Sequence, residues 1–333
     1  MSVRVLAVTN AYPRTDEESV GRFVKEQLDS LGAAGVDVRL LHVDRTREGP
    51  GVYRRLGPRL RGALAEHAPE VVHVMYGGVM ASVAARHVGA VPFVVSFCGN
   101  DLLGEGETTF KRRLVERYAI ACSRRAARRA DHVIVKSNPL REALPSGIDE
   151  ARISLVPNGV DLQQFSPLDR AESRARLGWP DDRRHVLFPA GPSRPEKRYW
   201  LARAAVDALP ADGGVEVELH VLENVSRPEV PTWLNASDAV LLTSTHEGSP
   251  NVVKEALACD VAVVSTDVGD VNERVAGVSG CAVTAATPDA LAAGLQEAFA
   301  AGRVNGRDAV KALALDRVAE RLERIYESVL PSP

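Results

Sequence analysis

Short runs of β-branched and other apolar residues alternate along the chain with longer segments whose apolar residues recur at helical spacing. This alternation is typical of a parallel sheet covered by helices. The first half predicts strands near residues 3–9, 36–43, 71–75, 93–97, 132–136 and 153–156. Helices are expected between them, for example over residues 20–31 and 110–129. The second half predicts strands near residues 185–189, 215–222, 239–243 and 261–265.

The alternation is interrupted around Pro157-Asn-Gly-Val-Asp161, and turn-forming residues are frequent after it. We therefore predict an α/β protein with two doubly wound, Rossmann-like domains, residues 1–163 and 164–308. A long amphipathic helix is expected over about 308–329, in a terminal segment (309–333) whose return to the first domain is left open. A doubly wound sheet binds its ligand beyond the carboxyl ends of its strands, so two domains facing each other would bind it in the cleft between them.

Composition limits the classes of function without choosing one. The 333 residues are 45% hydrophobic and 26% charged with a net charge of −3, which gives no reason to expect a nucleic-acid partner. The cysteines (Cys98, Cys122, Cys259 and Cys281) form no Cys-x-x-Cys pair, which argues against a disulfide framework or a zinc site. No basic leader precedes the first apolar run, and no apolar stretch approaches the ~18 residues of a membrane span, so we expect a cytoplasmic protein.

The most informative segment is LLTSTHEGSPNVVKEALAC, from Leu241 to Cys259. A strand is expected to end before its polar part, and a helix to begin with Ser249 as N-cap and Pro250 as first residue. The first amides of that helix, with the positive end of its dipole, form an anion site suited to a diphosphate. These amides belong to Asn251, Val252 and Val253.

Two carboxylates flank this helix start. Glu247 precedes it and Glu255 lies about a turn and a half into it, so one can reach a sugar beyond the phosphates and the other a ribose. The paired hydroxyls of a ribose suit a carboxylate, which accepts two hydrogen bonds at once. The alternative is that Glu247 is a loop residue and Glu255 part of an ordinary capped helix.

The segment Glu247-Gly-Ser-Pro-Asn-Val-Val-Lys-Glu255 resembles the signature of glycosyltransferase family 4, and Pro157–Asp161 and 21–28 resemble further parts of that family. The resemblance covers nearly the whole chain. It implies the GT-B fold, with residues 1–163 on the acceptor side and 164–308 binding a nucleotide sugar, and transfer with retention of anomeric configuration. It also implies that Glu255 binds the ribose and that Glu247 faces the donor sugar. The expected donor-binding residues are Gly21, Gly248, Ser249, Asn251, Val252, Val253 and Glu255.

The segment Gly191-Pro-Ser-Arg194-Pro-Glu-Lys197-Arg198 places cations at a helix start, where the helix dipole disfavours them unless an anion binds. The resemblance implies that Lys197 neutralises the leaving diphosphate, and that Arg194 substitutes for the arginine that the family has directly after Gly191. No Asp-x-Asp motif is present that would suggest a metal bound through carboxylates to the diphosphate, and the resemblance likewise implies metal independence. No metal is predicted, and no cofactor beyond the nucleotide-sugar co-substrate. The resemblance further implies front-side attack, in which a donor phosphate oxygen helps to deprotonate the acceptor.

The first domain departs from the family at Cys98, where a histidine is usual, and His73 is the first of two histidines often seen in its strand. His73 is as consistent with a structural part as with a catalytic one. Asp101 is the better candidate for contact with a sugar or acceptor hydroxyl. The catalytic candidates are Glu247, Lys197, Arg194 and Asp101, and the candidates for acceptor or sugar contact are His73, Cys98 and Asn100.

The acceptor is expected to be a hydroxyl of a glycan, a lipid-linked molecule or a natural product. The basic segment 111–129 could meet an anionic membrane or a polyprenyl diphosphate, while a solvated helix face is the plainer alternative. A sugar-nucleotide hydrolase or epimerase, and a non-catalytic nucleotide-sugar binder, remain alternatives. A dinucleotide oxidoreductase is disfavoured because Asn10-Ala-Tyr-Pro-Arg14, and not a Gly-x-Gly-x-x-Gly turn, follows the first strand. The nucleotide, the sugar, the linkage and the oligomeric state are left open.

Overall fold

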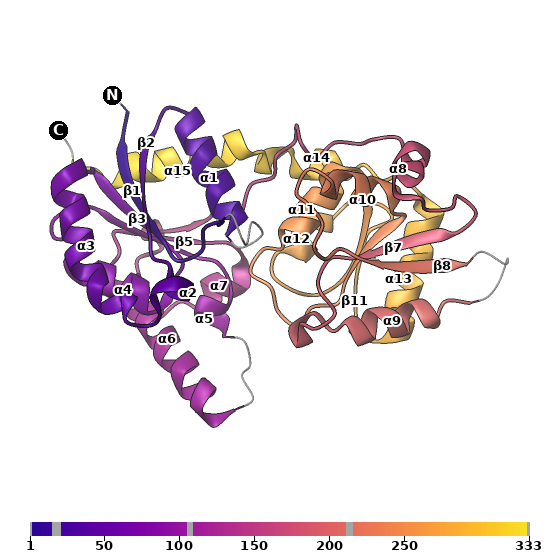
Figure 1. Cartoon of the computed structure of the whole chain (residues 1–333), viewed down its shortest axis with the longest axis horizontal. Helices are drawn as coiled ribbons and strands as arrows, with labels where there is room; N and C mark the ends of the chain where they lie inside the picture. The colour runs from indigo at the N-terminus through magenta and orange to yellow at the C-terminus, as the bar shows by residue number, and fades with distance from the viewer. Residues whose placement is uncertain (1, 15–20, 105–108, 211–215, 332–333) are drawn as a thin grey trace. The chain divides into compact units, whose positions relative to one another are not determined.

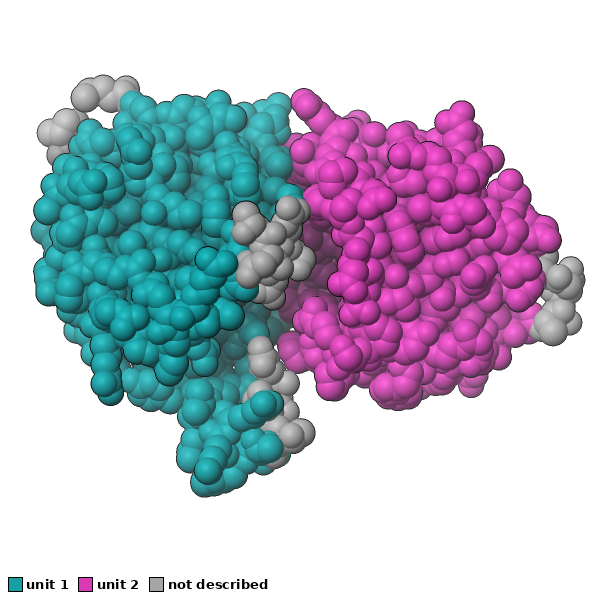
Figure 2. Space-filling model, viewed as in Figure 1, with its two compact units in different colours: residues 1–159, 315–333 teal, residues 160–314 magenta. Residues whose placement is uncertain are grey.

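The computed structural model describes residues 2–14, 21–104, 109–210 and 216–331. The chain divides into two compact units, residues 1–159 with 315–333 (unit 1) and residues 160–314 (unit 2), as Figures 1 and 2 show. Residues 20 and 215, which two of the predicted elements include, lie outside the described residues.

Unit 1 contains a six-stranded parallel sheet in the order β2-β1-β3-β4-β5-β6. Its strands are β1 (Arg4–Thr9), β2 (Asp37–His42), β3 (Val71–Met75), β4 (Phe93–Phe97), β5 (His132–Val135) and β6 (Ile153–Leu155). Its helices are α1 (Arg22–Ala33), α2 (Arg45–Glu48), α3 (Val52–His67), α4 (Gly78–His87), α5 (Asn100–Leu103), α6 (Phe110–Arg129), α7 (Asn138–Glu142), η1 (Glu150–Arg152) and α15 (Leu315–Val329). All residues of β3 and β4 are buried, because helices cover both faces of the sheet.

Unit 2 contains a five-stranded parallel sheet in the order β11-β10-β9-β7-β8. Its strands are β7 (Arg184–Phe188), β8 (Val217–Val221), β9 (Ala239–Leu242), β10 (Ala262–Thr266) and β11 (Ala282–Thr284). Its helices are α8 (Arg170–Leu177), η2 (Pro195–Lys197), α9 (Tyr199–Asp207), α10 (Val230–Ala236), α11 (Asn251–Ala258), α12 (Val271–Val275), α13 (Pro288–Ala301), α14 (Gly306–Val310) and η3 (Lys311–Leu313). The predicted α/β class with two doubly wound sheets is confirmed.

Helix α8 and strand β11 of unit 2 were not predicted. Helix α8 lies within the turn-rich stretch, where the Asp169 side chain accepts the backbone N–H of Glu172 and Gly178 ends the helix in a left-handed conformation. Strand β11 has three residues at the edge of the sheet, which is too short to produce a recognisable alternation. Residue patterns therefore identified the long central elements better than the short peripheral ones.

The single helix expected over 308–329 is wrong. The chain forms α14 and η3, becomes extended at Ala314 (φ −53°, ψ 144°), and begins α15 at Leu315. The carbonyl of Leu313 accepts the backbone N–H of Val160 at 2.8 Å instead of continuing a helix. A tertiary hydrogen bond thus interrupts a segment whose residue pattern is helical throughout.

Helix α15 belongs to unit 1, where it packs beside α1 on one face of the sheet. Tyr326 is fully buried there, and its hydroxyl lies 2.8 Å from Nδ1 of His73 in β3. The other ring nitrogen of His73 lies 2.7 Å from the hydroxyl of Ser96 in β4. Both nitrogens of a fully buried histidine are therefore satisfied by neighbouring side chains.

We expect Tyr326→Phe to destabilise unit 1 by about 1–3 kcal/mol, because it leaves Nδ1 of buried His73 without its hydrogen-bond partner. The change in the free energy of unfolding is measured by denaturant titration, with far-ultraviolet circular dichroism as the signal. Tyr118→Phe is the matched control, since that side chain is 60% exposed on α6 and its loss of a hydroxyl should have little effect. Equal stability of Tyr326→Phe and the parent chain would contradict the inference that this hydrogen bond stabilises unit 1.

Candidate active site

The loops that follow β7 and β9 meet at the carboxyl edge of the unit 2 sheet. Lys197 at the end of η2 makes an ion pair with Glu247, which lies in the loop after β9. The hydroxyl of Ser244 donates to the same carboxylate oxygen at 2.7 Å. The Lys197 and Glu247 side chains are 14% and 16% exposed, so the pair is largely shielded but still accessible. Two of the predicted catalytic residues are therefore in direct contact.

Glu255 forms a second ion pair at this edge. Its carboxylate accepts a hydrogen bond of 2.7 Å from the Arg227 guanidinium, in the loop between β8 and α10. The guanidinium lies 4.5 Å from the centroid of the Phe165 ring, in cation–π geometry. Sequence reasoning missed Arg227, because the loop carries no recognisable motif and only the fold brings it beside α11.

The start of α11 differs from the prediction. Pro250, and not Ser249, is the residue that precedes the helix, and no side chain caps it. The Ser249 hydroxyl donates to Asp270 at 3.0 Å and accepts from the buried Lys254 ammonium at 2.7 Å. Ser249 is thus used in a buried polar chain that fixes the loop, which is stronger than a cap because Lys254 and Asp270 are charged.

The first turn of α11 contains Asn251, Val252 and Val253, as predicted. The amino end of a helix carries partial positive charge, so this turn is suited to an anion. Gly269, after β10, has φ +59°, and a Cβ at this position would lie 2.9 Å from the carbonyl oxygen of Gly248. Close packing of two backbones therefore holds the loop that carries Glu247, and it requires glycine at position 269.

The two arginines beside Lys197 point in different directions. Arg194 is 58% exposed and pairs with Glu196, 2.7 Å away, so in this structure its guanidinium faces a carboxylate. Arg198 donates to the backbone carbonyls of Thr243 and Ser244 at 2.5 and 2.7 Å. Burial lowers the pKa of Arg198. Arg198 therefore ties η2 to the end of β9, and the proposal that Arg194 replaces the family's arginine stays a prediction.

A cavity of about 780 Å³ opens at the carboxyl edge of the unit 1 sheet. The loops after β1, β3 and β4 line it, together with α6. Its lining includes Asn10, Arg45, Tyr53, Tyr76, Asn100, Asp101, Lys111, Arg112 and Tyr118. Of the predicted residues, Asn100 and Asp101 line this cavity, whereas His73, Cys98 and Gly21 are not among its lining residues. Aromatic faces beside polar groups suit a sugar-like or other polyhydroxylated molecule.

Asp101 organises the loops around this cavity. Its carboxylate accepts the backbone N–H groups of Gly77 and Gly99, each at 2.8 Å, and that of Cys98 at 3.0 Å. Burial raises the pKa of Asp101, and these hydrogen bonds oppose that shift. Contact of Asp101 with an acceptor hydroxyl stays a prediction. In the structure, this side chain joins the loops after β3 and β4.

The surroundings of Cys98 and His73 do not favour the sugar or acceptor contacts for which these residues were candidates. Burial, followed by the nearby Asp101 carboxylate, raises the pKa of the Cys98 thiol to about 12, so the thiol is neutral. Burial lowers the pKa of His73 to about 3, and both ring nitrogens are occupied by Tyr326 and Ser96. This arrangement favours the structural alternative for His73.

Gly21 is required by packing. It precedes α1 with φ +68°, and a Cβ there would lie 2.2 Å from the carbonyl carbon of Ala11 in the loop after β1. No side chain fits between the two backbones. Tyr76, after β3, also has a positive φ of 93°, which is rare for a bulky residue and is often found near functional sites. Sequence reasoning missed Tyr76, which lines the cavity.

Helix α6 presents apolar side chains to solvent at the rim of this cavity. Phe110, Leu114, Val115 and Tyr118 are between 51% and 76% exposed. They alternate with cations in the sequence FKRRLVERY, and Figure 1 shows the first turns of α6 extending beyond the other helices of unit 1. Measured by length and hydropathy, the helices of the described residues include none that would span a bilayer.

Comparison with known proteins identifies the family. The model of Glycosyltransferase Family 4 matches residues 2–164, and the model of Glycosyl transferases group 1 matches residues 181–301. A glycosyltransferase assigned to teichuronic acid biosynthesis in Bacillus subtilis strain 168, TuaC, is 25% identical over 81% of this chain and 82% of that protein. The D-inositol 3-phosphate glycosyltransferase of Mycolicibacterium gilvum is 35% identical, over 52% of this chain and 45% of that protein.

Solved structures agree on the fold. A sucrose-phosphate synthase from Thermosynechococcus elongatus has a TM-score of 0.79 at 17% identity, covering 98% of both chains. Anabaena HepE in complex with UDP-glucose has a TM-score of 0.67 at 16% identity, covering 98% of this chain and 99% of that one. These likenesses are to enzymes of GT-B fold.

Together the family models match most of the chain, and their matches fall on both parallel sheets. The chain therefore belongs to glycosyltransferase family 4, a retaining family whose members use nucleotide-sugar donors.

Proposed function

We propose that this protein transfers a sugar from a nucleotide-sugar donor to a hydroxyl group of a lipid-linked or other glycan acceptor, with retention and without a metal ion at the diphosphate. The observation that carries the proposal is the contact between Lys197 and Glu247 beside the first turn of α11. A cation, a carboxylate and a helix amino end at one edge provide the groups that a nucleoside diphosphate sugar requires.

In this proposal, the leaving diphosphate binds at the first turn of α11 and takes Lys197 as its counter-ion. Negative charge develops on the diphosphate as the sugar becomes oxocarbenium-like, and fixed cations and amide dipoles stabilise that charge. Lys197 would exchange the Glu247 carboxylate for a phosphate, which releases Glu247 to accept hydroxyls of the donor sugar. The ion pair of Lys197 with Glu247 thus holds both side chains near their working positions.

Glu255 would accept the two ribose hydroxyls, with Arg227 keeping its carboxylate oriented. Arg227 donates to one oxygen of this carboxylate. A carboxylate can accept several hydrogen bonds, so this contact is compatible with binding the ribose hydroxyls. Arg227 is in this account a positioning residue. Gly21 would allow the backbone of unit 1 to approach the diphosphate, as the family resemblance implies.

The acceptor would bind in the unit 1 cavity, where Asn100 and Asp101 supply polar groups and tyrosines supply flat apolar faces. The exposed apolar residues of α6, interleaved with cations, support a lipid-linked acceptor, since an anionic diphosphate lipid offers both kinds of contact. This feature favours peripheral membrane contact over a plain solvated helix face.

A thermal-shift panel of UDP-, GDP-, ADP- and dTDP-sugars tests the function first. We expect one nucleotide to raise the melting temperature selectively, because a ligand of the folded state stabilises it by mass action. The selected donor is then incubated with a polyprenyl-diphosphate-linked sugar and with the same sugar lacking the lipid, and we expect transfer to the former. Nucleoside diphosphate release without a sugar product would instead indicate a hydrolase, and stabilisation without turnover would indicate a binding protein.

We expect Glu255→Ala to weaken nucleoside diphosphate binding about 10- to 100-fold, as expected for the loss of hydrogen bonds to a charged group. Arg227→Gln should weaken it in the same direction, since the carboxylate loses its partner. Isothermal titration calorimetry measures both, with Glu320→Ala as a control on an exposed carboxylate of α15. Unchanged affinity in a folded Glu255→Ala variant would remove the ribose role.

We expect Lys197→Ala to lower kcat by about 100- to 1000-fold, a loss typical of removing one group that stabilises developing charge. Steady-state transfer kinetics with the selected donor measure the effect. Lys311→Ala is the matched control, because that lysine is 65% exposed on η3. A Lys197→Ala variant that retains near-parental turnover would exclude Lys197 as the counter-ion of the leaving group.

A further inference from the structure

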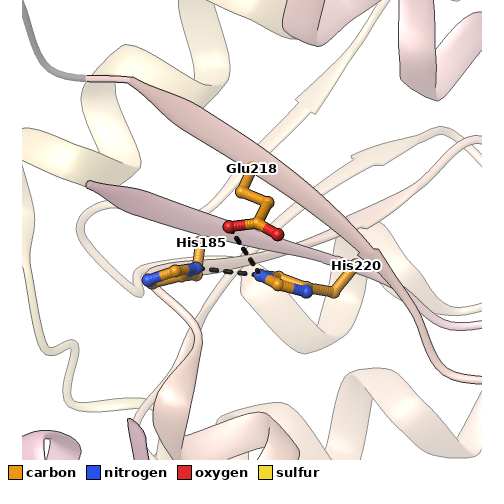
Figure 3. A group of neighbouring side chains, drawn as sticks. All are labelled: His185, Glu218 and His220. Carbon is orange, nitrogen blue, oxygen red and sulfur yellow. Dashed lines mark hydrogen bonds and ion pairs between the residues drawn. The ribbon is translucent and has the colours of Figure 1, made fainter. Parts of the chain in front are cut away.

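Three potential metal ligands converge in unit 2 on strands β7 and β8. His185 comes from β7, and Glu218 and His220 come from β8 (Figure 3). Their ligand atoms lie within 4.8 Å of one another. Nδ1 of His185 lies 2.8 Å from Nε2 of His220, which lies 4.0 Å from Oε2 of Glu218.

The backbone accounts for this convergence. His185 and Glu218 are register partners in the parallel pairing of β7 with β8. His220 follows Glu218 by two residues, so both side chains project from the same face of β8. The strands therefore fix where all three side chains begin, and no loop has to order for them to meet.

The hydrogen bonds determine which nitrogen offers its lone pair. Nε2 of His185 lies 2.7 Å from the carbonyl oxygen of Pro180, and a carbonyl only accepts, so this nitrogen carries the proton. Nδ1 of His185 is then unprotonated and faces Nε2 of His220. The hydrogen bond between the two rings therefore uses a proton on Nε2 of His220. A backbone carbonyl that fixes the tautomer of a histidine is a usual feature of metal sites.

Aromatic packing holds both imidazoles in place. The Trp179 ring stacks on His220 with centroids 3.5 Å apart and an interplanar angle of 9°, and on His185 at 4.9 Å. Trp233 packs edge-on against Trp179 at 5.3 Å. Glu218 remains 44% exposed and leaves the group open to solvent.

One cation competes for Glu218. Arg183 lies 3.8 Å from its carboxylate, but it also contacts Glu216 at 3.1 Å and Asp182 at 3.6 Å. Arg183 therefore retains two carboxylate partners if Glu218 turns toward the histidines. The absence of a Cys-x-x-Cys pair and of an Asp-x-Asp motif does not bear on a site built from imidazole and carboxylate ligands of two neighbouring strands.

We propose that His185 Nδ1, His220 Nε2 and Glu218 Oε2 bind a Zn²⁺ ion, with water as the fourth ligand. Bond lengths of about 2.0–2.2 Å in a tetrahedral site separate ligand atoms by about 3.3 Å. The nitrogen pair needs to open slightly from 2.8 Å and the carboxylate to approach from 4.0 Å. On binding, the ion takes the place of the His220 proton, which moves to Nδ1 of the same ring, so no net proton is released.

The ion would join β7 to β8 directly. The segment that contains Trp179 would be linked to the site through its contacts with the two histidines. His185 is the second residue of β7, whereas the loop that carries Lys197 leaves the other end of that strand. The proposed zinc site is therefore separate from the diphosphate chemistry, and we expect its effect on stability and not on the transfer step.

The test uses the full chain, stripped of metal with chelator and dialysed. We expect one Zn²⁺ per chain by calorimetry, and Co²⁺ to give the visible absorption of tetrahedral nitrogen–oxygen coordination. Zn²⁺ should also raise the melting temperature of the metal-free protein. Glu218→Gln should weaken Zn²⁺ binding by about tenfold or more, while Glu216→Gln, which alters a 69% exposed carboxylate nearby, should leave it unchanged.

His220→Phe retains a flat ring against Trp179 and should abolish the cobalt spectrum. Binding that survives both Glu218→Gln and His220→Phe, or the absence of any Zn²⁺ binding to the folded parent chain, would overturn the proposal. Nucleotide affinity of the metal-free chain is measured in parallel, so that failure of the zinc site is distinguished from failure of the donor site.

Discussion

The ion pair of Lys197 with Glu247 is the contact on which the candidate donor site depends. It joins the loops after two neighbouring strands, β7 and β9, so each loop determines where the other can lie. Arg198 adds hydrogen bonds from the same segment to the end of β9, and the buried chain of Lys254, Ser249 and Asp270 fixes the start of α11. Charged groups that satisfy one another in this way remain ordered without a ligand, which lowers the entropic cost of binding one.

In unit 1, hydrogen bonds from backbone amides fix the loops at the carboxyl edge of the sheet. Asp101 accepts N–H groups from the loops after β3 and β4, and Gly21 allows the loop after β1 to approach α1 closely. One carboxylate therefore holds together two of the loops that border the cavity. Tyr76 adds an unfavourable backbone conformation at the same place, which persists only because the surrounding contacts over-determine it.

Much of the fold was predictable, because strands buried on both faces produce apolar runs that are hard to mistake. The strands from β1 to β6 each coincide with a predicted run. An anion site was predicted from the start of the helix at Asn251 and from the basic segment at Lys197, but the ion pair of Lys197 with Glu247 was not predicted. What the sequence alone could not place were contacts between distant segments. Arg227 meets Glu255, and Val160 interrupts the terminal helix, only because the fold brings them together.

The position of Ser249 illustrates the remaining limit. A serine before proline at a helix start is expected to cap the helix. Here the Lys254 ammonium, five residues further on, donates a hydrogen bond to the Ser249 hydroxyl instead. Local propensity was overridden by a stronger interaction that the local pattern does not reveal. The same reason explains the group around His185, whose members are separated in sequence and adjacent only across two strands.

Unit 1 is discontinuous in sequence, and this affects the order in which the protein can mature on the ribosome. Residues 1–159 are synthesised first, and α1 covers part of one face of their sheet, but the rest of that face is covered only when α15 arrives with Leu322 and Tyr326. Unit 2 is continuous and has all of its residues before α15 is made. The nascent chain therefore carries an incompletely covered apolar sheet face through the whole synthesis of unit 2, a period in which premature association or chaperone binding competes with native closure.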